Sequence, residues 1–348
     1  MTAIKATSAP ALVVGTGFGC RTIVPALRAA GFEVVGLVGT DPERTRKRAA
    51  ASAVPQAFND LDAAITRTGA KVVVVATPPR THAPLSLLAI SRGCHVLCEK
   101  PFSLNADEAR AMLAAAKQAG VVHLVGHEFR WAPDRAIVAR AIGEGLIGQP
   151  RFVTLMQFLP LVANPEAKMP RWWFDPGAGG GWLGAHGAHI VDQIRTWLGE
   201  FASVSAALPM VSAREGVAED TYAVRFQLAG GVEGIVQSSA GAWGPAASVA
   251  RVAGTEGTLW VDGGTVRIAD RNGVRELPIP ADLVLPPALP LELGAYTRLC
   301  EALHAAMNGA TPRDSVPVPT FADGLAGMQM LEAIRASAAD GGARVAIR

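Results

Sequence analysis

The chain has little cysteine, little tyrosine and no excess of charge of one sign. Its 348 residues include four cysteines and two tyrosines, and the net charge is +2. No two cysteines have the Cys-x-x-Cys spacing of a zinc site, so we predict reduced thiols and no metal. No block of basic residues indicates a nucleic acid or an anionic membrane surface as partner.

Long apolar runs are also missing. No uninterrupted apolar stretch approaches the length that spans a membrane, and the first ten residues lack the apolar segment of a signal peptide. We therefore expect a soluble, cytoplasmic protein. What the chain does have is enough length for two domains with substantial cores, since half of its residues are apolar.

The first 125 residues alternate short apolar runs with helical segments. The apolar runs predict strands at residues 11–14, 32–38, 71–76, 95–98 and 121–125. Helix signals predict helices at residues 21–30, from Asp41-Pro42 onward, at 82–92 and at 106–119. Strands that alternate with helices are typical of a parallel, doubly wound sheet.

The pattern changes after about residue 150, where glycine-rich turns join short strands. We expect strands at residues 204–206, 221–228, 232–238, 248–253, 258–261 and 266–269, which predict a mostly antiparallel sheet. Helices are expected at residues 183–198, 293–307 and 321–338. The fold class is therefore α/β, with a dinucleotide-binding Rossmann domain at residues 1–127 and an α+β domain at 128–348. The closing helices are candidates for packing back on the first domain.

A glycine-rich turn lies between the first strand and the first helix, at Gly15-Thr16-Gly17-Phe18-Gly19-Cys20. Gly15 permits a tight turn, and Gly17 lets the backbone approach a pyrophosphate held by the N–H groups of the helix N-terminus. Cys20 stands in the third glycine position and is small enough for helix–strand packing. The strand–turn–helix context favours a dinucleotide over a turn without a ligand. The predicted contacts are Gly15, Gly17, Phe18, Gly19 and Cys20.

The end of the second strand indicates which dinucleotide binds. An enzyme that uses NAD places an acid there for the ribose hydroxyl, whereas this strand ends in Val38-Gly39-Thr40 and the next acid, Asp41, is expected to cap a helix. Arg44 and three further cations follow, and guanidinium groups suit a 2′-phosphate. We therefore expect NADP, with Gly39, Thr40 and Arg44 as contacts. The alternatives are NAD as cofactor and a solvated helix face for the cations.

Glu99-Lys100-Pro101 follows the strand expected at residues 95–98. A lysine at the carboxyl end of a strand in a nucleotide-binding sheet points into the ligand crevice, where its ammonium group can polarise a hydroxyl or carbonyl oxygen. Together with the glycine-rich turn, the triplet predicts a nicotinamide enzyme in which Lys100 is the electrophilic residue.

A second dense motif runs from Gly179 to Asp192 and contains three consecutive glycines, His186 and His189. Its glycines permit close approach of the backbone to a ligand. His189 and Asp192 share a helix face, so the carboxylate can orient an imidazole that accepts a hydroxyl proton. The alternative is a helix N-terminus packed on the sheet, with its histidines bonded to backbone. Zinc is disfavoured because no cysteine is near and the histidines are not four residues apart.

Arg171-Trp172-Trp173-Phe174 precedes this motif. Consecutive aromatic residues cannot all face one core, so this segment is a candidate wall of a substrate pocket, where a flat ring stacks on a sugar. Core packing is equally consistent with the pattern.

These motifs stand in an order that resembles the Gfo/Idh/MocA oxidoreductases, which include glucose–fructose oxidoreductase and inositol dehydrogenase. The resemblance rests on the two glycine-rich motifs, Thr77-Pro78-Pro79, Glu99-Lys100-Pro101 and the segment from Gly126 to Arg130-Trp131, and it covers nearly the whole chain. It implies a Rossmann domain and a second domain whose open sheet forms homodimers or homotetramers.

The resemblance also implies an activity, namely hydride transfer between nicotinamide and a carbon that bears a hydroxyl group, on a sugar or polyol. By this analogy Lys100 positions the substrate oxygen and the nicotinamide ribose, and His189 is the acid/base, with His186 and Asp192 as helpers. The remaining expected contacts are Thr77, Pro78, His82 and Glu99 on the cofactor, and Arg130, Arg171, Trp172, Trp173 and His186 on the substrate.

Two positions depart from the family pattern and make the pocket less polar. Ala185 stands where the family often has Asp, and Trp173 stands where it often has Arg. We therefore expect a bulkier or less hydroxylated substrate than a simple inositol, such as an aromatic-bearing glycoside, an anhydrosugar or an alicyclic alcohol. Two alternatives stay open. One is elimination or hydrolysis through transient oxidation, and the other is a non-catalytic dinucleotide sensor.

Overall fold

The structure, a computed structural model, describes residues 9–286, 289–310 and 314–347. It divides into two compact units. The first comprises Met1–Ser103, Asp107–Trp131 and Leu285–Leu325, and the second comprises Leu104–Ala106, Ala132–Val284 and Ala326–Arg348. The limits that we predict, 1–127 and 128–348, include residues 1–8 and 348, which lie outside the described residues.

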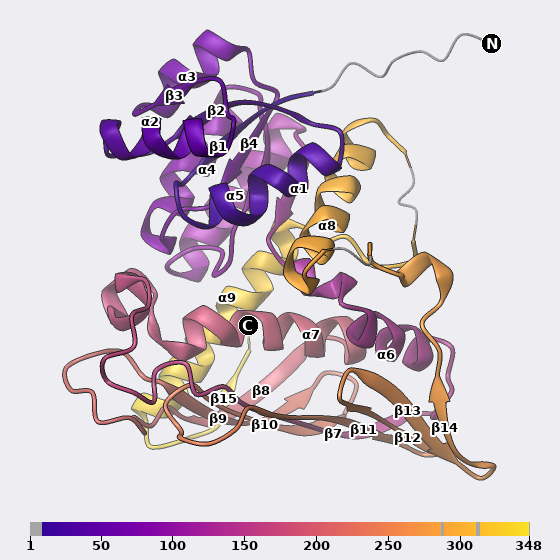
Figure 1. The fold of residues 1–348 in the computed structure, drawn as a ribbon. Helices are drawn as coiled ribbons and strands as arrows, with labels where there is room; N and C mark the ends of the chain where they lie inside the picture. Colours follow the sequence, from indigo (N-terminus) through magenta and orange to yellow (C-terminus); the bar gives the residue numbers. More distant parts are fainter. Residues whose placement is uncertain (1–8, 287–288, 311–313, 348) are drawn as a thin grey trace, which may run out of the picture. The chain divides into compact units, whose positions relative to one another are not determined.

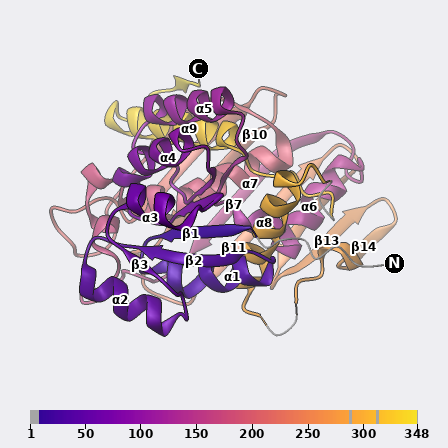
Figure 2. The ribbon, with the colours of Figure 1, turned by 90° about the horizontal axis from the view of Figure 1, so that it is seen from above.

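The first unit contains a parallel sheet of the predicted doubly wound kind, with the strand order β3-β2-β1-β4-β5-β6 (Figure 1, Figure 2). Its strands are β1 Pro10–Val14, β2 Glu33–Val38, β3 Ala57–Phe58, β4 Val72–Val75, β5 His95–Cys98 and β6 His123–Val125. Its helices are α1 Val24–Ala29, α2 Pro42–Ala51, α3 Leu61–Thr68, α4 His82–Ser91, α5 Ala106–Ala119 and α8 Leu291–Met307. Helix α1 packs against α8, and α3 packs against α4.

The apolar residues of these strands form the core of the first unit. All four valines of β4 are fully buried, as expected for a central strand covered on both faces. The side chain of Asp41 accepts the backbone N–H of Arg44, so Asp41 is the N-cap of α2, as its sequence predicts.

Several element limits differ from the sequence prediction, and hydrogen bonds explain two of the differences. The helix expected at 21–30 becomes α1 only at Val24, because residues Gly19–Ile23 form a π-helical turn in which the N–H of Val24 reaches the C=O of Gly19. Strand β6 begins at His123 and not at Val121. The N–H of Val121 bonds the last turn of α5, and that of Val122 bonds the ring of His95.

The second unit contains a nine-stranded sheet with the order β14-β13-β12-β11-β7-β10-β9-β8-β15. Within this sheet, only β7 and β10 pair in parallel among the described residues. The sheet is therefore mostly antiparallel, as predicted. Its strands are β7 Pro150–Phe158, β8 Phe201–Ala207, β9 Thr221–Leu228, β10 Glu233–Ser239, β11 Ala247–Gly254, β12 Gly257–Asp262, β13 Thr265–Asp270, β14 Gly273–Leu277 and β15 Val345–Ala346. The prediction missed the central strand β7 and the two edge strands, β14 and β15.

Helices α6 Pro133–Gly143 and α7 Ala188–Leu198 lie along one face of this sheet (Figure 1). Helix α9, Phe321–Ala339, begins in the first unit and continues in the second. Strand residues alternate between the two faces. Val224 and Val236 are buried on the helix-covered face, whereas Arg225 and Ile235 are exposed on the other.

Candidate active site

The glycine-rich turn follows β1 at the carboxyl edge of the parallel sheet, where β1 and β4 form the switch point of the strand order. Ligands of open α/β sheets bind at such a point. Gly15 has φ +124°, and a Cβ there would collide with the backbone carbonyl of Ala76, so only glycine fits. Gly17 is exposed and has no atom within 4 Å of a built Cβ, which leaves its backbone open to a ligand.

The close helix–strand contact of this turn belongs to Gly19. A Cβ on Gly19 would lie 2.8 Å from Cγ1 of Val13, whereas Cys20 is half-buried at the next position. The structure thus shows close packing at Gly19, the residue before the Cys20 position to which the fingerprint assigns it. A π-helical turn starts at Gly19.

The first carboxylate in the loop after β2 is Asp41. Gly39 and Thr40 follow Val38, and the side chain of Asp41 is taken by its capping bond. The side-chain amide of Asn59 donates to the C=O of Gly39 at 2.6 Å and so fixes this loop, a contact that our sequence reasoning missed. The side chains of Thr40 and Arg44 are exposed.

His82 connects the loop after β4 to the segment after β5. It is fully buried, with Nε2 2.7 Å from the C=O of Thr77 and Nδ1 2.9 Å from the C=O of Pro101. Burial lowers the pKa of His82, against the effect of these carbonyls, and a neutral ring donates to one of them at a time. The ring thus positions Thr77, which we predict to contact nicotinamide.

Glu99 and Lys100 follow β5 at the same carboxyl edge as Gly15. Glu99 is buried and accepts the hydroxyl of Tyr296 at 2.6 Å and the backbone N–H of Lys100 at 3.3 Å. Burial raises the pKa of Glu99, and the charge of Lys100 acts against this effect. The half-buried Lys100 therefore projects from a backbone that the carboxylate of its neighbour holds in place.

Arg130, expected to contact substrate, is bonded inside the first unit. Its guanidinium lies 2.8 Å from a carboxylate oxygen of Asp323 and 3.1 Å from the C=O of Pro317, and its side chain is 5% exposed. These contacts tie the start of α9 to the segment after β6, so the structure gives Arg130 a structural role.

The second motif forms a π-helical turn, Leu183–Gly187, that leads into α7. His186 lies in this turn, and His189 and Asp192 lie on α7. All three side chains are buried. His189 and Asp192 are three residues apart on one helix, which makes them neighbours on its surface, as predicted.

His186 has a defined position between two aromatic residues. Its ring stacks on Trp182, with centroids 4.4 Å apart and planes 2° from parallel, and its Nδ1 is 2.8 Å from the hydroxyl of Tyr222. Trp182 in turn donates its indole N–H to Ser238 at 2.8 Å. Because Tyr222 and Ser238 are opposite each other on β9 and β10, the turn is fixed to two adjacent strands.

The glycines of this motif approach the chain itself. A Cβ on Gly180 would collide with the C=O of Trp172, one on Gly181 with Glu219, and one on Gly184 with the C=O of Gly179. The expectation that these glycines admit a ligand is therefore corrected for these three positions, because protein atoms fill the space.

The aromatic segment forms a 3-10 turn, Arg171–Phe174, in which both tryptophans are half-buried. Trp172 contacts Trp173 edge-on, and Trp173 contacts Trp182 at 5.7 Å between centroids. The segment thus continues the aromatic cluster that ends at His186, while the side chain of Arg171 is exposed.

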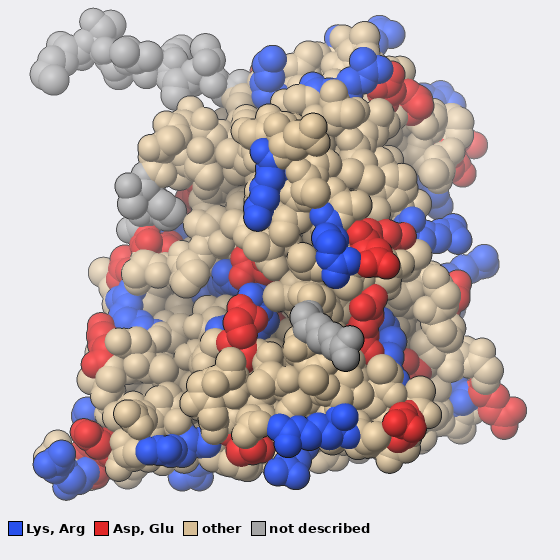
Figure 3. Space-filling model, turned by 180° about the vertical axis from the view of Figure 1, so that it is seen from behind, with Lys and Arg blue, Asp and Glu red and all other residues tan. Residues whose placement is uncertain are grey.

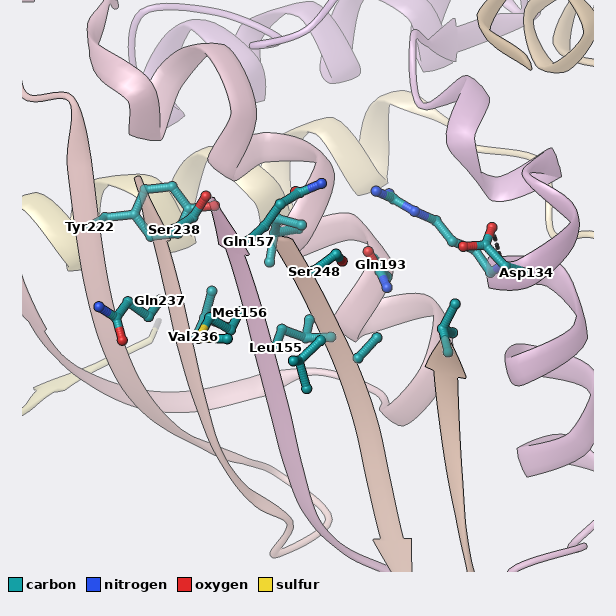
Figure 4. A pocket seen from close by; sticks show the side chains of 15 residues that line it. Asp134, Leu155, Met156, Gln157, Gln193, Tyr222, Val236, Gln237, Ser238 and Ser248 are labelled. Atoms are coloured by element: carbon teal, nitrogen blue, oxygen red, sulfur yellow. Dashed lines mark hydrogen bonds between the residues drawn. The ribbon is translucent and has the colours of Figure 1, made fainter. Parts of the chain in front are cut away.

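A polar cavity of about 100 Å³ lies in the second unit between α6, α7 and the sheet (Figure 4). Its wall includes Tyr222 and Ser238, which lie side by side in the figure, together with Gln157, Gln193 and Ser248. The volume accommodates several water molecules, and the amide and hydroxyl groups can bond them. No sequence motif points to these cavity residues.

Comparisons with known proteins agree with this architecture. Residues 10–127 match a family described as "Oxidoreductase family, NAD-binding Rossmann fold", and residues 136–260 match the "GFO/IDH/MocA C-terminal domain". A D-apiose dehydrogenase of Paraburkholderia graminis is 31% identical over 278 residues, which are 76% of this chain and 70% of that protein. The chain belongs to the Gfo/Idh/MocA oxidoreductase family.

Other members of the Gfo/Idh/MocA family extend the similarity. A 1,5-anhydro-D-fructose reductase of Ensifer adhaerens is 29% identical over 313 residues, covering 84% of this chain and 88% of that one. Among solved structures, a levoglucosan dehydrogenase in complex with NADH and levoglucosan superposes with a TM-score of 0.86 at 24% identity over 98% of this chain and 99% of that one. An oxidoreductase domain protein from Kribbella flavida superposes with a TM-score of 0.87 at 26% identity over 98% and 100%.

The chain is thus an oxidoreductase with an NAD-binding Rossmann domain. The first unit fits the dinucleotide, because Gly17 offers open backbone at the switch point of the sheet. No helix in the described ranges has the length and apolar character needed to cross a membrane. On the face that Figure 3 shows, acidic and basic side chains are interspersed over the described residues.

Proposed function

We propose that this protein transfers hydride between NADP and a secondary alcohol or ketone of a sugar, polyol, glycoside or related cyclic alcohol. The observation that carries the proposal is the carboxyl edge of the parallel sheet, where Lys100 follows β5 and the open backbone of Gly17 follows β1. The bound cofactor supplies the hydride chemistry. Lys100 positions the substrate oxygen, and His189 exchanges its proton.

The substrate class is supported by the relatives. Three of these relatives are named for D-apiose, 1,5-anhydro-D-fructose and levoglucosan, which are all carbohydrates or anhydro sugars. Ala185 and the half-buried Trp173 remove an acid and a cation that the family pattern often has, so we propose a less hydroxylated member of this class.

The preference for NADP is supported by the loop after β2. Thr40 stands near the position where an NAD enzyme places an acid, and the nearby carboxylate of Asp41 caps α2. The relatives include both kinds of enzyme. A levoglucosan dehydrogenase was solved with NADH, and a D-xylose 1-dehydrogenase (NADP(+)) of Haloferax volcanii is 31% identical over 136 residues. A binding titration with both cofactors decides the preference.

The experiment that tests the function is a panel of sugars, polyols, anhydro sugars and glycosides, read by NAD(P)H absorbance with each cofactor. Lys100→Met is expected to lower kcat/KM by at least about 100-fold, because the substrate oxygen loses its cationic partner. Lys117→Met, which removes an exposed lysine on α5, serves as the control. Normal turnover of Lys100→Met with saturating cofactor would contradict the proposal.

Two other outcomes identify other functions. Turnover with tightly held cofactor and no net absorbance change indicates elimination or hydrolysis through transient oxidation. Cofactor binding with no turnover of any substrate indicates a dinucleotide sensor. This alternative is considered because Ala185 stands where the family often has Asp.

We also propose a homodimer or homotetramer formed through the open face of the nine-stranded sheet. This face exposes large apolar side chains on neighbouring central strands, with Phe152 43%, Ile235 46% and Val249 38% exposed. Large apolar side chains exposed on three adjacent strands, with Arg225 and Thr154 opposite Ile235, support an interaction site with an apolar centre and polar surroundings. A cytoplasmic location stays a prediction, supported by the free state of all four cysteines.

A further inference from the structure

Two buried carboxyl groups lie beside Lys100 in the first unit, and the proposed mechanism uses neither. Glu99 precedes Lys100 at the end of β5. Glu128 begins the 3-10 turn Glu128–Trp131 that follows β6, the neighbouring strand. The residues are 6% and 3% exposed. Gly126, between β6 and this turn, is so close to Glu99 that a Cβ there would lie 2.5 Å from the carboxylate.

Glu99 has the partners that an ionised carboxylate needs. It accepts the hydroxyl of Tyr296 and the backbone N–H of Lys100, and the ammonium charge of Lys100 acts on it. Each of these contacts stabilises the charged form. Burial raises the pKa of Glu99, and these three contacts act against that effect, so the ionised form has more support at Glu99 than at Glu128.

Glu128 is in a different situation. Its Oε2 atom is buried and has no hydrogen-bond partner among the residues that the structure describes. Burial first, and then the negative charge of Glu99, raise the pKa of Glu128 to about 8, while Lys100 acts in the opposite direction. Two neighbouring carboxyl groups in a dry site do not both ionise at neutral pH.

The titratable groups that act on Glu128 lie at the end of β5 and on α8. Glu99 and Lys100 face it from the end of β5, Tyr296 and Glu292 from α8, and His127 precedes it in the chain. With Glu128 neutral, the charges of Glu99 and Lys100 balance. Arrival of one further positive charge at this edge removes that balance and favours ionisation of Glu128.

We propose that Glu128 holds a proton in the free protein at neutral pH and releases it when the oxidised cofactor binds. The inference rests on the proposed function, because it places the nicotinamide ring at the sheet edge where Lys100 lies. The oxidised ring carries a positive charge and the reduced ring is neutral. The O–H bond of the Glu128 carboxyl breaks, the carboxylate remains, and the proton passes to solvent. No electron moves in this step.

The coupling has a definite sign. Because the oxidised cofactor favours the ionised form, its Kd is expected to fall as the pH rises from about 6 to about 9, whereas the Kd of the reduced cofactor is expected to change little. A lowering of the Glu128 pKa by one unit on binding corresponds to a tenfold change in Kd between the two limits.

The test is isothermal titration calorimetry of the full chain with NADP+, NADPH, NAD+ and NADH. Each titration is done in two buffers that differ in ionisation enthalpy, because the difference in heat gives the number of protons released. We expect proton release with the oxidised cofactor and little with the reduced one. Glu128→Gln is expected to remove both the release and the pH dependence of Kd. Glu33→Gln, which removes an exposed carboxylate at the opposite edge of the sheet, is expected to retain them.

The outcomes separate this inference from the function on which it rests. If neither cofactor binds, the proposed function fails. If both oxidised and reduced cofactors bind with the same proton count, or if Glu128→Gln keeps the pH dependence, the inference alone is overturned. The proton count on the unmodified protein decides the matter even if the variant does not fold.

Discussion

The two tyrosines of this chain both support predicted site residues. Tyr222 is hydrogen-bonded to His186, and Tyr296 donates to Glu99, the neighbour of Lys100. Both are fully buried and would otherwise count as core residues. Their phenol groups combine a large apolar body with one polar group, which is what fixes a site residue inside a core.

Replacement of Tyr222 tests its part in holding the π-helical turn. We expect Tyr222→Phe to lower the free energy of unfolding by about 1–3 kcal/mol, because Nδ1 of the buried His186 loses its partner. The catalytic efficiency falls with it, since the turn leads directly to His189. Urea unfolding and steady-state kinetics measure the two effects. Ser248 lines the same cavity of the second unit as Tyr222, and its side chain is exposed. Ser248→Ala is expected to change the free energy of unfolding by less than about 0.5 kcal/mol.

The raised pKa of Glu128 also makes the stability of the cofactor-free protein depend on pH. In the unfolded chain this group ionises near its ordinary value of 4.5, whereas in the folded protein it stays protonated up to about 8. The folded state therefore binds more protons, and its stability falls with rising pH in this interval by up to about 1.4 kcal/mol per pH unit. Glu128→Gln should lack this slope, which denaturant unfolding at several pH values measures. Equal slopes in both proteins would contradict the assignment.

At the scale of elements, periodicity and caps predicted both sheets and most helices. They did so because buried strands, helix caps and glycine-rich turns leave local patterns, as β4 and the Asp41 cap show. Strand β7 left no such pattern, because apolar residues stand on both its covered and its open face, so apolar and polar residues do not alternate along it. The π-helical turns were also missed. Each contains a glycine in close contact with another part of the chain, Gly19 with Val13 and Gly184 with the C=O of Gly179, and such contacts leave no local pattern.

The same limit applies to the candidate site. Glycine-rich motifs identify where the backbone makes close contacts, and the structure shows whether a ligand or the protein makes them. Gly17 is open, whereas Gly180 and Gly184 are blocked by carbonyl groups of residues that lie near them in the chain. The family resemblance likewise placed Arg130 in a motif, but its partner Asp323 lies far away in sequence.

The ion pair between Arg130 and Asp323 is expected to fix the start of α9 to the first unit. Asp323→Ala should lower the free energy of unfolding by about 3 kcal/mol, because it leaves a guanidinium that is 5% exposed without its carboxylate. Glu233→Ala, which removes the partner of the exposed Arg225 on the second sheet, should cost less than about 1 kcal/mol. Chemical denaturation of the two variants measures the difference, and equal losses would contradict a structural role for the buried pair.

At the scale of the whole molecule, the chain combines a cofactor unit with a sheet that has one covered and one open face. A sheet face with exposed Phe152, Ile235 and Val249 is costly to leave in water, and a second copy of the chain would cover it. Ile235→Lys places a charge at the centre of this face and should weaken association by at least about 100-fold, or about 3 kcal/mol. Val274→Lys, on the edge strand β14 where Val274 is 67% exposed, is the matched control. Light scattering coupled to gel filtration should show a smaller particle for Ile235→Lys alone. An unchanged mass at micromolar concentration would mean that the open face does not form the interface.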